Sequence, residues 1–280
     1  MPFFIVLTAR WRLGAGKRLS IVPQKKENEI RYFHIMEGVG INSETKICQY
    51  LDLEYLMKIL NEGAYYVKRK KFFVDDREKD FPELLRFGLE PMDPEYRKDH
   101  AAEIANRQVE WSKSVSQYKK QSYLLTSCWT VRTMENILMW DRGDKSRACI
   151  VSTIGDFVGS FEKDINYEIW CGRMFYEPFS KVFKFENKIW VKEPFFSDEN
   201  EIRFYFSSSF EKVETDTPKE KEKECPEKGV SLKVIPKQMM REIVLSPYLD
   251  KKCAESLSKA ITDKYQINAR PSLLDLSNKE

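Results

Sequence analysis

The chain has 280 residues, of which 42% are hydrophobic and 32% are charged, so it can bury the core of one large domain or two small ones. Its 47 Lys and Arg residues nearly balance its 44 Asp and Glu residues, which leaves a formal net charge of +3. A dedicated nucleic-acid binder usually shows a clear basic excess, so this composition disfavours that class. No apolar run approaches the length of a membrane span, and the positive charges near the N-terminus follow the apolar residues instead of preceding them. We therefore expect a cytoplasmic protein that does not enter a membrane.

The cysteines and histidines do not predict a metal site. The six cysteines are scattered singly, none forms a C-x-x-C pair, and the only histidines are His34 and His100. A zinc site needs three or four converging ligands, which nothing local supplies. We expect buried free thiols and no metal.

The first 45 residues precede the part of the chain whose sequence patterns clearly predict strands and helices. Residues 1–45 are broken by glycines and a proline, and we expect an N-terminal extension of hairpin and loop. Residues 46–275 are predicted to form a single domain that opens with a strand at 46–50. A helix follows from Leu53, and Gly63 stands where its C-terminal cap should lie.

The middle of the chain is dominated by strand patterns. A helical spacing of apolar residues covers 101–120, after which alternation returns. The predicted strands are 122–130, 147–153, 167–176, 181–185, 188–192 and 201–207. Strands outnumber helices and few β-α-β units occur, so the predicted fold class is α+β, with a mixed, largely antiparallel sheet and flanking helices.

A charged insertion separates this middle region from the last elements. Residues 211–229 alternate Lys and Glu and cannot bury apolar surface, so we expect a mobile loop there. A strand at 230–235, a short helix at 236–243 and a helix at 252–264 are predicted to close the domain.

The segment 199–206 is the most informative local pattern. Side chains alternate between the two faces of a strand, so its apolar and polar residues should separate. The apolar set is Ile202, Phe204 and Phe206, and the polar set is Glu201, Arg203 and Tyr205, with Glu199 just ahead. Two carboxylates and a guanidinium on one surface can stabilise positive charge that develops on a sugar, or polarise a hydroxyl. A solvated strand face with ordinary ion pairs explains the same pattern.

Two other clusters have competing interpretations. Residues 69–78 carry three carboxylates and four basic groups, which can anchor a phosphate or a hard metal ion but also suit a polar loop. Residues 126–141 group aromatic and sulfur side chains, which are more often core than a cofactor site. Ser127 has no nearby histidine to activate it, so a serine-hydrolase triad is unsupported. The usual glycine-rich nucleotide loops are absent.

The order of several short motifs resembles the bacterial domain-of-unknown-function (DUF) 2971 family over about residues 46–275. The motifs are Tyr50 before a Leu-rich helix, Phe73, Asp76 and Glu78 in a loop, Ser127-Cys128-Trp129, Leu138-Met139-Trp140, Cys149-Ile150, Glu199 to Arg203, and Ile243 to Pro247. The chain departs from the family pattern in three places. Val74-Asp75-Asp76-Arg77 replaces Asn-Asp-Pro-Phe, and both an aromatic residue after Met-Trp and a glycine before Cys149 are missing.

More distantly, the layout is similar to the ADP-ribosyltransferase fold, which implies an NAD-dependent ADP-ribosyltransferase-like or NAD-glycosidic enzyme. The resemblance implies that Glu201 stabilises the oxocarbenium ion as nicotinamide leaves, that Glu199 orients the acceptor and that Ser127 supports the pocket. It implies a cofactor site made of Tyr50, Gln49, Arg69, Asp76, Trp140 and Arg203. Tyr50 or Gln49 stands where that fold usually has Arg or His, so the NAD phosphates need Arg69, Arg203 or another cation.

Two other function classes stay open. A non-catalytic module can use the same polar face to capture a small nucleotide or a partner, and it should show a shallow or blocked site. A metal-dependent nuclease can use Asp75, Asp76 and Glu78, and it should need magnesium. An enzyme should bring Glu201, Arg203, Tyr50 and Trp140 into one cleft. The sequence does not indicate whether a protein or a nucleic acid is the acceptor.

Overall fold

The computed structural model describes residues 19–21, 24–26, 29–31, 33–36, 40–69, 124–131, 135–141, 147–162, 167–176, 190–208 and 228–274. Several sequence predictions lie outside these ranges. They concern the helix at 101–120, the strand at 181–185, the acidic cluster that contains Asp76, and most of the charged insertion at 211–229.

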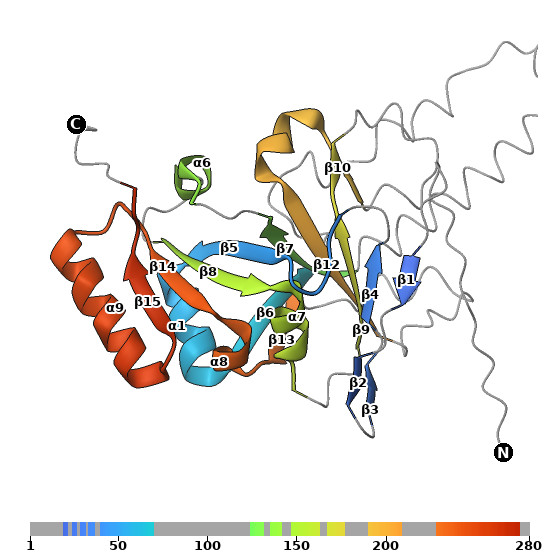
Figure 1. The fold of residues 1–280 in the computed structure, drawn as a ribbon, viewed down its shortest axis with the longest axis horizontal. Helices are drawn as coiled ribbons and strands as arrows, with labels where there is room; N and C mark the ends of the chain where they lie inside the picture. The colour runs from blue at the N-terminus through green and yellow to red at the C-terminus, as the bar shows by residue number, and fades with distance from the viewer. Residues whose placement is uncertain are drawn as a thin grey trace, which may run out of the picture.

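A large twisted sheet organises the described part of the chain (Figure 1). Its strands follow the order β1 (Leu19–Ile21), β4 (Phe33–Met36), β9 (Tyr167–Arg173), β12 (Glu201–Ser208), β7 (Leu125–Thr130), β5 (Lys46–Asp52), β8 (Arg147–Thr153), β14 (Glu242–Leu245) and β15 (Asn268–Pro271). Two further strands branch from it, since β6 (Ala64–Arg69) pairs with both β7 and β13 (Gly229–Lys233). Only β4–β9 and β14–β15 are parallel pairs within this sheet. The predicted α+β class with a mixed, largely antiparallel sheet is confirmed.

Strands from the first 45 residues belong to this sheet. β4 pairs in parallel with β9, and β1 pairs with β4 at the edge. Two small ribbons lie apart from the main sheet in its hydrogen bonding: β2 (Gln24–Lys26) with β3 (Glu29–Arg31), and β10 (Phe175–Tyr176) with β11 (Val191–Lys192).

The helices within the described residues are mostly short. They are α1 (Leu53–Glu62), α6 (Ile137–Asp141), α7 (Ile154–Gly159), the 3₁₀ helix η5 (Pro194–Glu199), α8 (Pro236–Met239) and α9 (Lys251–Tyr265). α1 ends as predicted, because Gly63 takes a left-handed conformation with φ 59° and its N–H bonds the carbonyl of Ile59. None of the described helices combines the length and apolar character needed to cross a membrane.

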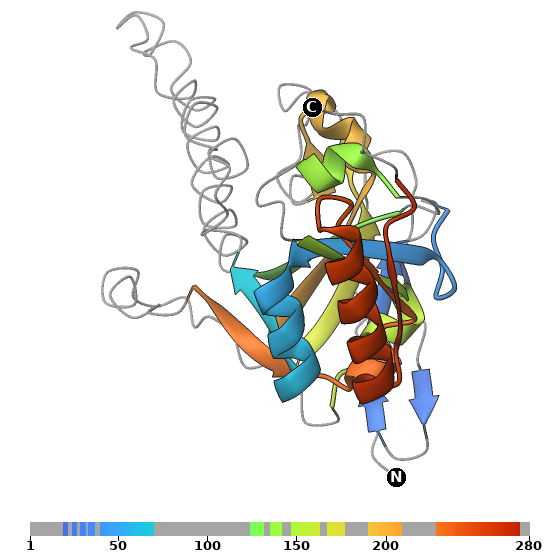
Figure 2. The same ribbon diagram turned by 90° about the vertical axis from the view of Figure 1, so that its left-hand side faces the viewer.

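One face of the sheet carries the main hydrophobic core. The helices α1 and α7 cover it, and Figure 2 shows α1 and α9 next to each other at the β14–β15 end. The Tyr265 hydroxyl joins these two helices by a hydrogen bond of 2.5 Å to Asn61 Oδ1. The rings of Phe157 in α7 and Phe204 in β12 pack edge-to-face with their centroids 4.6 Å apart, which is favourable aromatic geometry.

The opposite face carries two smaller apolar clusters. One contains Trp190, Tyr205 and Met174, and the other contains Trp140 with Cys48, Cys149 and Val244. Charged and hydroxyl side chains of β7 and β12 lie on the same face as these clusters, and they form part of the candidate site.

Candidate functional site

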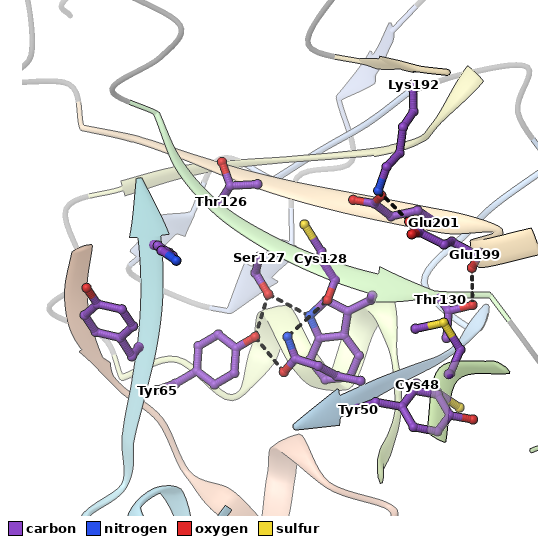
Figure 3. Close-up of a pocket in the computed structure, with 15 residues that line it drawn as sticks. Cys48, Tyr50, Tyr65, Thr126, Ser127, Cys128, Thr130, Lys192, Glu199 and Glu201 are labelled. Carbon is purple, nitrogen blue, oxygen red and sulfur yellow. Dashed lines mark hydrogen bonds and ion pairs between the residues drawn. The ribbon is translucent and has the colours of Figure 1, made fainter. Parts of the chain in front are cut away.

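A fork in the sheet positions the site. β7 pairs with β5 through only one residue pair, Thr130 with Cys48, and with β6 through Thr126–Lys68 and Leu125–Arg69 at its other end. Between these contacts β5 and β6 diverge, because β5 follows β8 over seven residue pairs and β6 follows β13 over five. A cleft of about 440 Å³ opens at the fork (Figure 3).

The cleft brings together five residues that the sequence predicted for the site. They are Gln49, Tyr50, Ser127, Glu199 and Glu201. The other lining residues are Cys48, Tyr65, Tyr66, Lys68, Thr126, Cys128, Trp129, Thr130, Met139 and Lys192. Segments far apart in sequence therefore meet in the cleft. Of the four residues that an enzyme should bring together there, Glu201 and Tyr50 line it, whereas Arg203 and Trp140 do not.

A hydrogen-bond network forms one wall at the fork. The Trp129 indole donates to Ser127 Oγ at 2.8 Å, and Ser127 Oγ lies 2.5 Å from the Tyr65 hydroxyl. That hydroxyl donates to Gln49 Oε1 at 2.9 Å, and Gln49 Nε2 donates to the Cys128 carbonyl at 3.1 Å. Figure 3 shows this chain of contacts running from β7 to β6 and β5.

The direction of the network defines the role of Ser127. Because Tyr65 donates its only hydroxyl proton to Gln49, Ser127 must donate its own proton to Tyr65. Burial raises the pKa of Tyr65 above its ordinary value although both contacts lower it, so the phenol stays neutral. Ser127 is thus a structural member of the wall, and the supporting role that the resemblance implies stays a prediction.

Four charged side chains form a compact cluster on the face of the sheet opposite the main core. Lys192 Nζ lies 2.5 Å from Glu199 Oε2 and 3.0 Å from Glu201 Oε2, as Figure 3 shows. Arg203 holds the other side of Glu201 through its Nε and one terminal nitrogen. The cluster is buried, with exposed fractions of 3% for Glu201 and 2% for Arg203.

The backbone at Asn200 explains how two nearby carboxylates reach one lysine. Asn200 takes a left-handed conformation with φ 45° between η5 and β12. Its side-chain amide donates to the Val131 carbonyl at 2.7 Å, which ties this turn to the end of β7. The Glu199 carbonyl is held there too, since it accepts from Thr130 Oγ1 at 2.5 Å.

The cluster keeps Glu201 ionised. Burial acts to raise the pKa of Glu201, but Arg203 and Lys192 outweigh it and lower that pKa to about 2. The backbone N–H of Glu201 donates to the Tyr176 hydroxyl at 2.6 Å, and burial raises the pKa of Tyr176 to about 12. At neutral pH the cleft wall presents an ionised carboxylate, and the neutral phenol of Tyr176 holds the backbone of Glu201.

A glycine on β9 leaves room for an aromatic side chain to cover this cluster. Gly172 pairs with Arg203, and a Cβ at Gly172 would lie 2.6 Å from the ring of Trp190. The Trp190 ring packs edge-to-face against the Tyr205 ring, with the two centroids 4.8 Å apart. Trp190 therefore reaches over the neighbouring strand only because position 172 has no side chain.

Tyr50 forms the cleft wall on the β5 side. Its ring packs edge-to-face on Trp140 at 4.7 Å, and its hydroxyl accepts from the Asn136 backbone at 3.1 Å. Burial raises the pKa of Tyr50, so it too stays neutral. Tyr50 offers this cleft an aromatic surface and no charge.

Three predicted cofactor-binding residues do not line the cleft. Arg203 points to the predicted strand face, but Trp190 and Tyr205 cover that face, and its guanidinium is used by Glu201. Trp140 is fully buried behind Tyr50. Arg69 pairs with Leu125 at the far end of β6, and Asp76 lies outside the described residues.

The sequence interpretation missed two lysines and a tyrosine of the cleft. Lys192 follows the apolar run Ile189-Trp190-Val191, where a buried lysine requires an acidic partner, and Glu199 and Glu201 come shortly after. Lys68 and Tyr65 lie in β6, and their neighbours come from β7, which is distant in sequence.

Metal chemistry finds no support in the described ranges. No three His, Cys, Asp or Glu residues there are grouped closely enough to hold a metal ion. The five cysteines in those ranges are not in disulfide bonds: Cys48, Cys149 and Cys171 are buried, Cys128 is partly buried and Cys253 is exposed. Asp75, Asp76 and Glu78 lie outside the described part of the chain.

Comparison with known proteins does not assign the chain to a family. No family model matches the chain, and no curated protein matches it. The resemblance to the DUF 2971 family therefore stays a prediction. Among solved structures the chain is similar to Thermus sp. 2.9 DarT in complex with ADP-ribosylated ssDNA, with 9% sequence identity and a TM-score of 0.34 over 84% of this chain and 96% of that one. This likeness is too weak to bear on the function.

Proposed function

We propose that the cleft binds NAD and breaks its bond between ribose and nicotinamide, with Glu201 as the group that stabilises the developing positive charge. The observation that carries this proposal is an ionised, rigidly held carboxylate on the wall of a cleft. A fixed carboxylate stabilises a cationic transition state more than a mobile one, since no reorganisation is needed when the charge develops.

The chemical step follows from this placement. The bond between ribose C1′ and the nicotinamide ring nitrogen breaks, and both electrons go to the ring, which leaves as neutral nicotinamide. The positive charge spreads over C1′ and the ring oxygen of the ribose, near Glu201. A water or acceptor hydroxyl then forms a bond to C1′ and loses its proton. Glu199 accepts that proton, since its carboxylate binds the same lysine as Glu201 does.

The size and lining of the cleft suit this substrate class. Its volume of about 440 Å³ falls in the range of small-molecule sites, which is roughly 300–1,000 Å³. The aromatic rings of Tyr50, Tyr65 and Trp129 line it together with the carboxamide of Gln49. Such a surface accepts a flat heteroaromatic ring with an amide substituent.

A non-catalytic binding module is the second candidate, and one observation favours it. Both Glu201 oxygens already accept bonds from cations, Oε1 from Arg203 and Oε2 from Lys192 and Arg203. A carboxylate that is satisfied within the protein can serve to shape a pocket without reacting. The two candidates differ in whether nicotinamide is released.

The test is nicotinamide release from NAD by the purified full chain, with and without a cell lysate as the source of acceptors. We expect release by the wild type, and a loss of about 100-fold or more in Glu201→Gln. Glu255→Gln is the matched control, because Glu255 is an exposed residue of α9 away from the cleft. Release that survives in Glu201→Gln, or that the wild type never shows, contradicts the proposal.

A further inference from the structure

The charges around the cleft do not cancel. Lys192 and Arg203 together balance Glu199 and Glu201, because the four side chains form one ion-paired cluster. Among the described residues that line the cleft, this leaves Lys68 as the remaining basic side chain. Lys68 is partly buried, and it has no acidic partner in the described part of the chain.

We propose that Lys68 and Tyr66 form an anion subsite that binds a diphosphate group. This inference rests on the proposed function and deepens it, since NAD carries a diphosphate and the residues expected to meet it are unsuitable. Arg203 is covered and held by Glu201, and Arg69 does not line the cleft. A lysine ammonium is a compact point charge with three donors, which suits a phosphate oxygen.

The strand register places this subsite on the correct face. Lys68 pairs with Thr126 of β7, and Glu201 pairs with Thr130 of the same strand. Side chains of directly paired residues share a face, and residues four apart on one strand also do, so Lys68 and Glu201 lie on the same face. Thr126 and Thr130 are about 13 Å apart along β7, which separates the anion subsite from the reacting carbon at the carboxylates.

Gly229 provides a second, independent observation. It pairs with Lys68 on β13, and a Cβ at Gly229 would lie 2.6 Å from Tyr66 Cζ and 2.7 Å from Tyr66 Oη. The phenol of Tyr66 therefore lies over a position that only glycine leaves open, directly beside Lys68 on the same face. Both side chains line the cleft, so the phenol hydroxyl can donate to an anion that Lys68 attracts.

Calorimetric titration with inorganic pyrophosphate tests the subsite without requiring any reaction. We expect the wild-type full chain to bind pyrophosphate, and Lys68→Gln to weaken binding roughly tenfold or more, since a charge-assisted bond is lost. Tyr66→Phe keeps the ring and should weaken binding by about threefold. Lys58→Gln is the matched control, because Lys58 is an exposed lysine of α1 that does not line the cleft, and it should bind as the wild type does.

Equal affinity in wild type and Lys68→Gln, or no binding by the wild type, overturns the subsite. Its failure is distinguishable from failure of the proposed function. Pyrophosphate binding that depends on Lys68, without nicotinamide release, supports the subsite and contradicts the enzyme. Nicotinamide release that depends on Glu201, with unchanged pyrophosphate affinity in Lys68→Gln, supports the enzyme and contradicts the subsite.

Discussion

The two faces of β12 are equally buried but chemically opposite. On one face Ile202, Phe204 and Phe206 pack into the main core, with exposed fractions of 0–1%. On the other face Glu201, Arg203 and Tyr205 are exposed by only 2–3%. The first face excludes water with apolar atoms, whereas the second does so with charges that are paired to one another.

This contrast separates a face that stabilises the fold from a face whose net contribution to stability is small. Apolar burial stabilises a fold directly, while buried ion pairs must recover a large desolvation cost and are often replaceable by apolar residues. The ion-paired cluster of Lys192, Glu199, Glu201 and Arg203, three of whose members line the cleft, therefore indicates a use for their charge.

The apolar face should give the largest effect on folding. Phe204→Ala should lower the free energy of unfolding by about 3–5 kcal/mol, since it opens a cavity between Phe157 and Trp129. Urea denaturation measures the loss, with Phe195→Ala as the control because that side chain is 54% exposed. Similar losses in both variants would contradict the packing described for β12.

The charged face should respond to the removal of one partner more than to the removal of both. Arg203→Met should destabilise the fold by about 3 kcal/mol, because it leaves Glu201 buried with Lys192 as its one remaining cation among the described residues. Adding Glu201→Gln should recover part of that loss. A double-mutant cycle by urea denaturation measures the coupling, and strictly additive losses would show that the two groups do not interact.

Acid should also distinguish the two faces. The folded-state pKa of Glu201 is lowered from 4.5 to about 2, so its stabilisation is present above about pH 4.5 and is lost as the pH falls toward 2. Between about pH 5 and pH 3 the wild type should lose about 2 kcal/mol more than Glu201→Gln does. Urea midpoints at the two pH values measure this difference, and parallel losses in both proteins would contradict the lowered pKa.

The hydrogen-bond wall of the fork should give the smallest effect. Ser127→Ala removes the acceptor of the Trp129 indole and the donor to Tyr65, so we expect about 1–2 kcal/mol of destabilisation. Nicotinamide release should change by less than about fivefold, since the Ser127 proton is committed to Tyr65. A loss as large as that in Glu201→Gln would make Ser127 a participant in the reaction.

Local patterns were sufficient to predict much of this fold. Period-two alternation correctly assigned the facing of the side chains of β12, and the position of Gly63 after a Leu-rich run correctly predicted the end of α1. Both features depend on neighbours along the chain. Alternation did not reveal that Arg203 would be covered, because Trp190 reaches it across β9 only where Gly172 lacks a side chain.

The cleft itself could be predicted only in part, since it exists where β5 and β6 separate from β7. Glu199, Glu201 and Ser127 come from motifs that the sequence shows, but Tyr65 and Lys68 enter through strand pairings across more than 50 residues. Lys192 had a readable signal in the apolar run before it, although its partners are fixed by the left-handed turn at Asn200.

The most direct test of the central claim measures one folded sample of Glu201→Gln twice, for its affinity for ADP-ribose and for its nicotinamide release from NAD. If Glu201 acts on the transition state, ADP-ribose affinity should stay within about threefold of the wild type while release falls by about 100-fold or more. If release is retained while affinity is unchanged, Glu201 does not act on the transition state, and the central claim is wrong.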